Sequence, residues 1–129
     1  MEAPLAEASD KTNELAKLNL LQRVRGLVSP GNTVLILGMS YKPDTYITEE
    51  SAGLHLAQNL KRHGYRVLVH DFAAAPANSP ALHEFEIVND LNGLEKRQDI
   101  DLAVICCPWS QYRSLKLSPA TRSLPTWQL

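Results

Sequence analysis

TVLILGMSYKPDTYITEESAGLHLAQNLKRHGYRVLVHD, residues 33–71, contains a complete strand–helix–strand unit. Residues 33–37 and 66–70 are short apolar runs rich in β-branched residues, which is typical of strands that are covered on both faces. A helical segment lies between them. A strand, a helix and a strand at this spacing predict a right-handed βαβ unit, and therefore a parallel sheet.

The helix between these strands is predicted from apolar residues that recur every three or four positions. Thr48 is a candidate N-cap, Glu49 and Glu50 follow it where the helix dipole favours acids, and Gly64 suits a C-terminal cap. The residues predicted to face the core are Ala52, Leu56, Ala57 and Leu60.

The rest of the chain extends the same pattern. An amphipathic stripe predicts a helix over residues 12–28, after a frayed segment over residues 1–9. Further elements are predicted as strands at 86–88 and 101–106, a short helix at 90–98, a helical turn at 109–115 and, at best, a short edge strand within 123–129. The fold class is therefore α/β, a Rossmann-like three-layer sandwich with a parallel sheet, preceded by an N-terminal helix. We expect residues 1–31 to form a helical arm and residues 32–129 to form the Rossmann-like domain.

The composition argues against several partners. The chain has 13 basic and 14 acidic residues, a net charge of -1, so binding to nucleic acid or to an anionic membrane is not expected. Its two cysteines, Cys106 and Cys107, are adjacent and would point to opposite faces of a strand, which disfavours a disulfide between them. The sequence also lacks zinc-ligand spacing, a signal-peptide core and an apolar stretch of membrane-spanning length. A reduced, cytoplasmic setting fits best.

Three segments follow predicted strands and should therefore lie at the carboxyl edge of the sheet, where open parallel sheets bind ligands. They are GMSYKPDT, DFAAAP and CCPWSQY, which begin at residues 38, 71 and 106. In the first, Lys42 could meet a phosphate as a point charge, and Tyr41 offers an aromatic face and a hydroxyl. The alternative is a solvated lysine beside a tyrosine that covers the core, and the residues alone favour that alternative.

The other candidates each have a structural alternative. No GxGxxG follows the first strand, so this chain is not expected to hold NAD by itself. Asp71 ends the second strand where dinucleotide-binding folds place a ribose-binding acid, but a lone acid there is more often a turn residue. Cys106 and Cys107 suggest a thiol nucleophile only if a base activates one of them, so packing is the favoured role. Trp109 and Tyr112 are interpreted as packing residues, because no basic run surrounds them.

Two motifs resemble the C-terminal domain of the UDP-glucose/GDP-mannose dehydrogenase family. The first is VLILGMSYKPDTYITEESAGLHLAQNLKRHGYRVLVHD, in which a strand and a glycine precede aromatic-Lys-Pro-x-Thr; the second is DIDLAVICCPWSQYRSL, a strand that ends in a Thr-x-Trp type turn. The resemblance covers about residues 15–117. It implies that Tyr41 and Lys42 contact the nucleotide part of the substrate, and that Thr45 is the motif threonine. Residues 32–129 would then be the nucleotide-sugar-binding domain, binding UDP or a UDP-sugar.

In this family, as the resemblance implies, NAD binds to a separate N-terminal Rossmann domain, and two hydride transfers oxidise the sugar C6 alcohol to a carboxylate. The catalytic cysteine, lysine and asparagine of the family lie outside the matched region, so no catalytic residue is assigned to this chain. The expected partners are UDP or a UDP-sugar, bound weakly, and the NAD-binding domain of the full enzyme.

The chain departs from the family pattern at several positions. Ile47, Thr48 and Glu49 stand where the family usually has Asp-x-Arg, and Cys107 stands in place of the usual threonine. The final strand with its substrate-binding arginine is not recognisable, and Arg122 is a displaced candidate for that role by proximity alone. A second interpretation therefore stays open: a non-catalytic relic domain that serves oligomerisation or binds an unknown small ligand.

Self-association into a homo-oligomer is a further hypothesis. The predicted first helix carries an apolar stripe wider than one face of a small sheet requires, and the family it resembles is oligomeric. The alternative is that this helix simply packs on its own sheet. The stripe consists of Leu15, Leu18, Leu20, Leu21, Val24, Leu27 and Val28.

Overall fold

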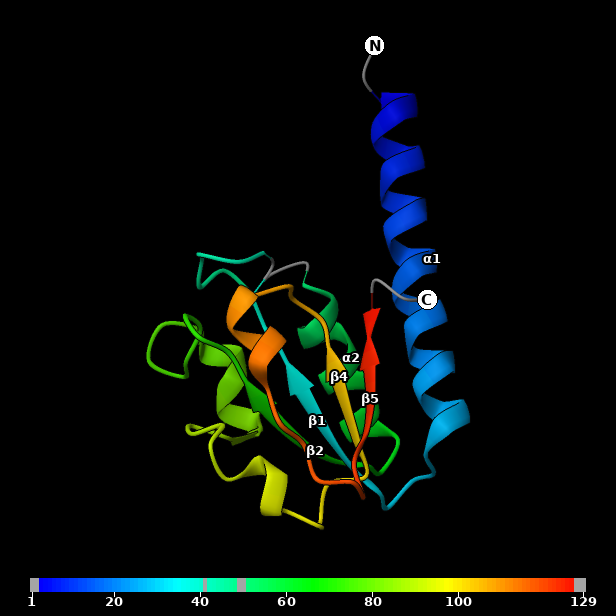
Figure 1. The fold of residues 1–129 in the computed structure, drawn as a ribbon. Coiled ribbons are helices and arrows are strands. Elements are labelled where there is room, and N and C mark those ends of the chain that lie inside the picture. Colours follow the sequence, from blue (N-terminus) through cyan, green and yellow to red (C-terminus); the bar gives the residue numbers. More distant parts are fainter. Residues whose placement is uncertain (1–2, 41, 49–50, 127–129) are drawn as a thin grey trace.

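The computed structural model describes residues 3–40, 42–48 and 51–126 and contains one five-stranded sheet (Figure 1). The longer helices are α1 (Ala3–Leu27) and α2 (Ala52–Arg62). The strands are β1 (Thr33–Leu37), β2 (Arg66–His70), β3 (Glu86–Ile87), β4 (Leu102–Ile105) and β5 (Arg122–Pro125). Three short 3-10 helices complete the fold: η1 (Pro80–Glu84), η2 (Leu94–Lys96) and η3 (Ser110–Ser114).

The sheet has the strand order β3-β2-β1-β4-β5, and every neighbouring pair is parallel. β1 lies at the centre, where Leu35 is aligned with Leu68 of β2 and with Ala103 of β4. All five residues of β1 are buried, as the continuous apolar run 33–37 predicted. The predicted Rossmann-like α/β class with a parallel sheet is confirmed.

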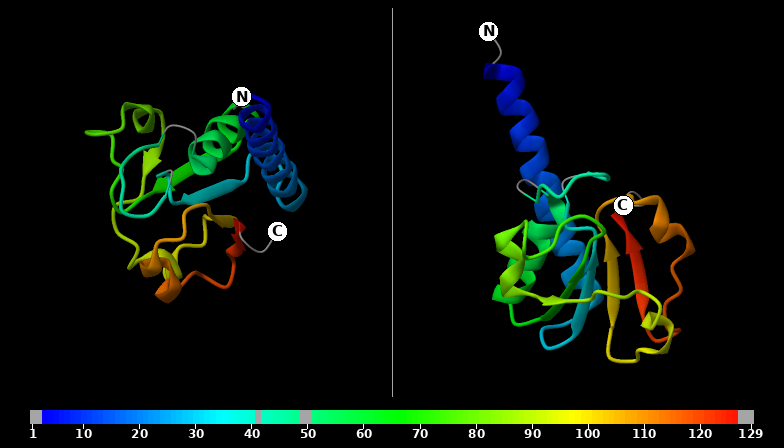
Figure 2. Two further views of the ribbon diagram at one scale, coloured as in Figure 1. Left: turned by 90° about the horizontal axis from the view of Figure 1, so that it is seen from above. Right: turned by 90° about the vertical axis from the view of Figure 1, so that its left-hand side faces the viewer.

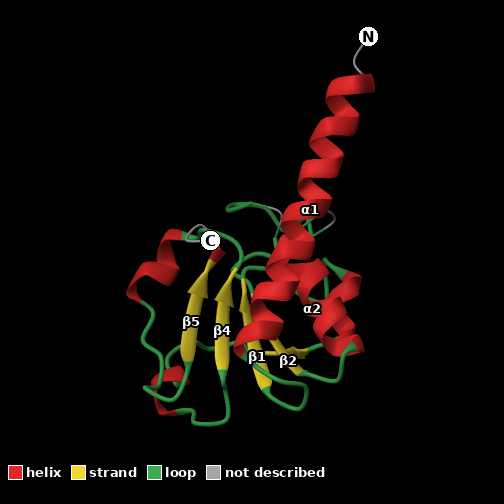
Figure 3. Cartoon of the chain, turned by 90° about the vertical axis from the view of Figure 1, so that its right-hand side faces the viewer, coloured by secondary structure: helices red, strands yellow, loops and turns green. Residues whose placement is uncertain are grey.

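The two faces of the sheet are covered differently. Alternate strand residues, such as Val34 and Ile36, pack with α1, α2 and η1, whereas Leu35 and Leu37 pack with η2, η3 and the segments beside them. Figures 2 and 3 show α1 and α2 together on one side of the sheet. Within the described residues, the helical elements of the opposite layer are the short turns η2 and η3, which lie in the connections after β3 and β4.

The first helix is longer than the sequence pattern predicted. It begins at Ala3, not near residue 12, because residues 3–11 contain good helix formers and their only proline stands in the first turn, where it is tolerated. Its later part reaches the core: Leu20, Leu21 and Val24 are buried, as is Val28 just after the helix, whereas Leu15 and Leu18 are exposed. Figure 1 shows the N-terminal part of α1 extending past the rest of the molecule. Among the described residues, no helix is both long and apolar enough to cross a membrane.

Two further predictions were wrong. The N-cap of α2 is Ser51 and not Thr48, because the Ser51 hydroxyl accepts a hydrogen bond from the Leu54 amide at 2.9 Å, while Thr48 is buried in the preceding turn. Glu49 and Glu50 lie outside the described residues. The helix predicted at 90–98 is reduced to η2, since the Asp90 side chain accepts a hydrogen bond from the Asn92 amide and forms a turn there instead.

Candidate functional site

The loops that follow β1, β2 and β4 meet at the carboxyl edge of the sheet, as predicted (Figure 1). β1 lies between β2 and β4, and the chain leaves it toward β2 through α2. In open parallel sheets, ligands usually bind at the carboxyl edge, at the point in the strand order where the chain connections run to one side from one strand and to the other side from its neighbour. The loop between β1 and α2 therefore occupies the position where a site is expected.

Asp71 holds the start of this loop in place. Its Oδ1 accepts hydrogen bonds from the amides of Met39 at 2.8 Å and Ser40 at 3.0 Å. Its Oδ2 accepts hydrogen bonds from the Ser40 hydroxyl at 2.6 Å and from the amides of Ala73 at 2.9 Å and Ala74 at 2.8 Å. Burial acts to raise the pKa of Asp71, but the hydrogen bonds from Ser40, Ala74 and Ala73 together outweigh it and lower the pKa. The carboxylate thus joins the loop after β1 to the loop after β2.

Gly38 lets β1 pass close to its neighbours before the loop begins. It has a φ of +98°, and its amide donates to the His70 carbonyl at 2.8 Å. A Cβ at this position would lie 2.5 Å from the Cys107 Cβ and 2.6 Å from the Cys107 amide nitrogen. A Cβ on Gly53, in the first turn of α2, would lie 2.3 Å from the Gly38 carbonyl oxygen. Two glycines therefore allow β1, β4 and the start of α2 to converge.

The middle of the loop is fixed at a second point. The Ser79 hydroxyl donates to the Tyr46 carbonyl at 2.9 Å, and Ser79 is buried. Asp44 has a left-handed φ of 66°, and Thr45 Oγ1 accepts a weak hydrogen bond from the Ile47 amide at 3.3 Å. These contacts place Lys42, which is exposed, and Thr45 on the loop at the carboxyl edge. Tyr41, the third predicted site residue, lies outside the described residues.

The described residues do not fit NAD. The oxygens of Asp71, which would have to accept from a ribose hydroxyl, already take five hydrogen bonds from the protein. The turn after β1 carries Ser40 where a second glycine would let a pyrophosphate approach. The turn-residue interpretation of Asp71 is thereby supported, and no NAD site is assigned to this carboxyl edge.

The cysteines lie in the core. Cys107 is buried in the apolar cluster on the η2–η3 face, and Cys106 packs against the cluster on the α1–α2 face. Burial raises the pKa of both thiols to about 12, which keeps them protonated at neutral pH. The packing role predicted for both is supported. Within the described part of the chain, His, Cys, Asp and Glu side chains form no group that could hold a metal ion.

Arg122 does not lie at this edge. It is the first residue of β5, aligned with Leu102 at the start of β4, and its guanidinium donates to the Leu27 carbonyl at 3.2 Å. Because all five strands are parallel, the first residue of β5 lies at the amino edge. The hypothesis that Arg122 replaces the substrate-binding arginine of the family is therefore wrong, and Arg122 instead ties β5 to the end of α1.

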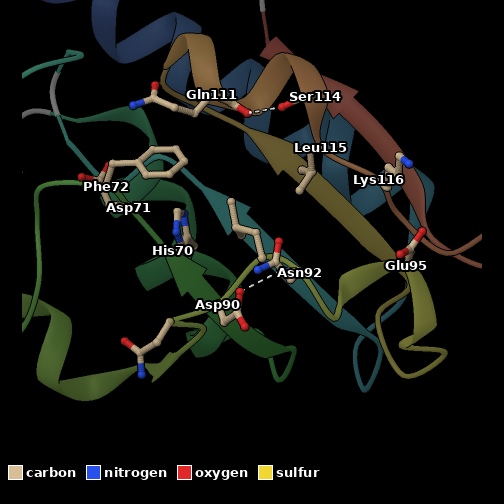
Figure 4. A pocket seen from close by; sticks show the side chains of 12 residues that line it. His70, Asp71, Phe72, Asp90, Asn92, Glu95, Gln111, Ser114, Leu115 and Lys116 are labelled. Carbon is tan, nitrogen blue, oxygen red and sulfur yellow. Dashed lines mark hydrogen bonds between the residues drawn. The ribbon is translucent and has the colours of Figure 1, made fainter.

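Sequence reasoning missed Phe72, which follows Asp71 and is 40% exposed. Its ring packs against His70, Trp109 and Tyr112, with centroid distances of 4.8, 5.4 and 5.0 Å. Trp109 and Tyr112 are buried, so the packing role predicted for them is confirmed. Phe72 and His70 also line an open pocket of about 680 Å³ on the η2–η3 face (Figure 4). The sequence offers one indication of this role: an aromatic residue comes directly after the aspartate that follows the second strand.

Comparison with known proteins identifies the family to which this domain is similar. The sequence profile of the UDP-glucose/GDP-mannose dehydrogenase family, UDP binding domain, matches residues 35–126. The chain is 28% identical over 117 residues to UDP-glucose 6-dehydrogenase TuaD of Bacillus subtilis (strain 168), covering 88% of this chain and 25% of that protein.

A similar fold occurs in the solved structure of a UDP-glucose dehydrogenase from the hyperthermophilic archaeon Pyrobaculum islandicum. The TM-score is 0.67 at 24% identity, over 90% of this chain and 30% of that one. The chain thus spans about a quarter to a third of the length of these relatives. Because the profile covers most of the chain, from the middle of β1 to the end of β5, the chain belongs to the UDP-glucose/GDP-mannose dehydrogenase family and corresponds to its UDP-binding domain.

Proposed function

We propose that this chain binds UDP or a UDP-sugar at the carboxyl edge of the sheet, with Lys42 and Thr45 in contact with the nucleotide. Tyr41, adjacent to Lys42, completes the proposed site from the motif. The observation that carries the proposal is the clamp by Asp71, which holds Met39 and Ser40 through three hydrogen bonds. Lys42 follows Ser40 by two residues, so its backbone starts from a fixed point at the edge where ligands bind.

The charges near the loop predict a low affinity for a diphosphate. Lysine meets phosphate oxygens as a point charge, and Pro43 restricts the backbone of Lys42 to extended conformations. The N-terminus of α2, capped by Ser51, directs its positive end toward this region. Glu49 and Glu50 precede that helix and oppose an anion, so we expect weak binding.

We further propose that the chain supplies the nucleotide-sugar-binding domain for an NAD-dependent oxidation of a sugar C6 alcohol to a carboxylate. The match to a dehydrogenase family supports this role. We place NAD on a separate domain, because the described residues fit it poorly, and we assign no catalytic thiol to this chain, because burial keeps both cysteines protonated. Two free thiols suit the reducing cytoplasm, where we place the protein.

Lys42→Ala is expected to weaken UDP binding by about ten- to a hundredfold, because a charge-assisted hydrogen bond is worth roughly 1.5–3 kcal/mol. Isothermal titration calorimetry with UDP measures the change. Lys96→Ala is the matched control, because Lys96 is an exposed lysine in η2. Equal UDP affinity for the wild type and Lys42→Ala would move the nucleotide away from this loop. If the wild type gives no binding heat or NMR shift with UDP, the proposed function itself is wrong.

The alternative function, self-association by a non-catalytic domain, is favoured by two exposed leucines on α1. Leu15 is 59% exposed and Leu18 is 47% exposed, although both belong to the apolar stripe of that helix. The remaining members of the stripe, Leu20, Leu21, Val24, Leu27 and Val28, pack on the chain's own core. A second copy that covers the two leucines would remove this apolar surface from water.

Sedimentation velocity at micromolar concentration is expected to show a dimer that Leu18→Glu converts to a monomer, since a buried charge without a partner opposes association. Ala16→Glu adds the same charge at another exposed position of α1, about 160° around the helix from Leu18, and should leave the dimer intact. A monomeric wild type, or equal loss of the dimer in both variants, would contradict self-association through these leucines.

A further inference from the structure

The pocket beside Phe72 lies where the described part of the chain places only short helical turns on this face of the sheet. The connection from β3 to β4 forms only the single turn η2, and the connection from β4 to β5 forms only η3. The gap between these turns is lined by the end of β2, by residues 89–92 and by residues from η3 onward. Its volume of about 680 Å³ falls within the range of small-molecule sites, about 300–1,000 Å³.

Phe72 forms an apolar wall of this pocket. Three rings support it: His70 in an edge-on arrangement at 4.8 Å, and Tyr112 and Trp109 in tilted arrangements. His70 is itself held by a hydrogen bond of 2.9 Å between its Nδ1 and the Tyr112 hydroxyl. A partly exposed aromatic ring that packs against three others loses less entropy than an unsupported one when a flat, apolar ligand face stacks on it.

Apart from Leu91 and Leu115, the remainder of the wall consists of hydrogen-bonding side chains, among which acids outnumber bases. Figure 4 shows Phe72 and Gln111 near one side of the pocket, Asp90 and Asn92 near the floor, and Glu95 with Lys116 at the far side. Within the described part of the chain, the side-chain amide groups of Asn89 and Asn92 make no hydrogen bond to the protein. These amides can both donate to and accept from a ligand.

The charges of the lining disfavour an anion. Asp71, Asp90 and Glu95 carry negative charge, and Lys116 carries the single positive charge among the lining side chains. Burial lowers the pKa of His70 more than the neighbouring Asp71 raises it, so the imidazole is neutral at pH 7. A phosphate would meet a net negative lining, whereas hydroxyl groups would find carboxylate and amide partners.

We propose that this pocket binds a monosaccharide unit, a neutral ring rich in hydroxyl groups. The apolar face of the sugar stacks on Phe72, and its hydroxyls bond to Asn89, Asp90 and Asn92. The site is distinct from the proposed UDP site, because none of Lys42, Thr45 and their loop neighbours lines it. A ring compound of this size, with few atoms and strong hydration, is expected to bind in the millimolar range.

The test is a titration of the ¹⁵N-labelled 129-residue chain with methyl α-D-glucopyranoside, methyl α-D-mannopyranoside and methyl β-D-galactopyranoside. At least one glycoside should give saturable amide shifts in residues 89–92 and 111–116. Phe72→Leu, which keeps an apolar side chain without an aromatic face, should weaken binding about five- to tenfold, and Phe72→Tyr should restore it. Asn89→Ala should weaken binding about fivefold, whereas Gln98→Ala, an exposed amide outside the pocket, should not change it.

Three results would overturn the proposal. The first is the absence of saturable shifts with all three glycosides in folded wild-type protein. The second is equal binding by the wild type and Phe72→Leu. The third is uridine, which has an aromatic base, shifting the same amides at lower concentration than any glycoside. UDP titrated in parallel separates this site from the nucleotide site, because its shifts should lie in residues 38–48 and remain in Phe72→Leu.

Discussion

Gly38→Ala is expected to lower the free energy of unfolding by about 3–4 kcal/mol, a large effect for a single methyl group. A left-handed φ costs an alanine roughly 1–2 kcal/mol, and Gly38 has a φ of +98°. The new Cβ would also lie 2.5 Å from the Cys107 Cβ, so β4 or the loop must move. Urea unfolding followed by circular dichroism measures the loss, and displacement of the loop should abolish UDP binding as well.

Two other glycines provide matched controls. Gly31 has a similar φ of +94°, but a Cβ added there would have no atom within 4 Å, so Gly31→Ala isolates the backbone cost of about 1–2 kcal/mol. Gly26 lies inside α1 with the same open surroundings, and Gly26→Ala should stabilise the protein by about 0.5–1 kcal/mol. Equal losses in Gly38→Ala and Gly31→Ala would show that the contact with Cys107 contributes nothing.

Asp71→Asn is expected to cost about 2–3 kcal/mol of stability, because an amide cannot accept on both sides. If its oxygen faces Met39 and Ser40, its NH2 group confronts the amides of Ala73 and Ala74, which lose their acceptor. The loop after β1 and the loop after β2 then separate. UDP binding should weaken together with stability, since the same carboxylate fixes the start of the Lys42 loop.

The pH dependence of stability identifies this carboxylate. The folded-state pKa of Asp71 lies below that of an unfolded aspartate, about 3.9. The stabilisation is therefore complete above the unfolded pKa and is lost as the pH falls from about 4 through the folded pKa. Urea midpoints measured between neutral pH and acid should fall more steeply below about pH 4 in the wild type than in Asp71→Asn. Parallel acid slopes would show that Asp71 is not the carboxylate responsible.

Asp99→Asn is the control for this experiment. Its pKa is lowered to about 2, first by the hydrogen bond from Arg97, which is 2.6 Å long between Nη2 and Oδ2. The pair is exposed, with 44% of the Asp99 side chain accessible, so water screens it. We expect a loss of about 0–1 kcal/mol and no effect on UDP binding, since surface ion pairs contribute little.

The sequence by itself determined the βαβ unit and the approximate place of the loop. The buried runs 33–37 and 66–70 became β1 and β2 at the predicted residues. These runs are rich in β-branched residues and apolar on both faces, a pattern that predicts a central parallel strand. Lys42 and Thr45 were placed at the carboxyl edge for the same reason, because a loop must leave a strand at its end.

Only the tertiary structure decided which of these residues work together. Asp71 and Ser40 are 31 positions apart in the chain, and no local pattern indicates that one carboxylate would take five hydrogen bonds. Arg122 was a candidate for the family's substrate-binding arginine by proximity alone, and it lies at the amino edge because the start of a short edge strand depends on its partner β4 and not on its own propensity. Phe72 gained a supporting wall only when β2 and η3 met. Periodicity encodes which face of an element is buried, whereas convergence of side chains from distant segments depends on the packing of the whole sheet.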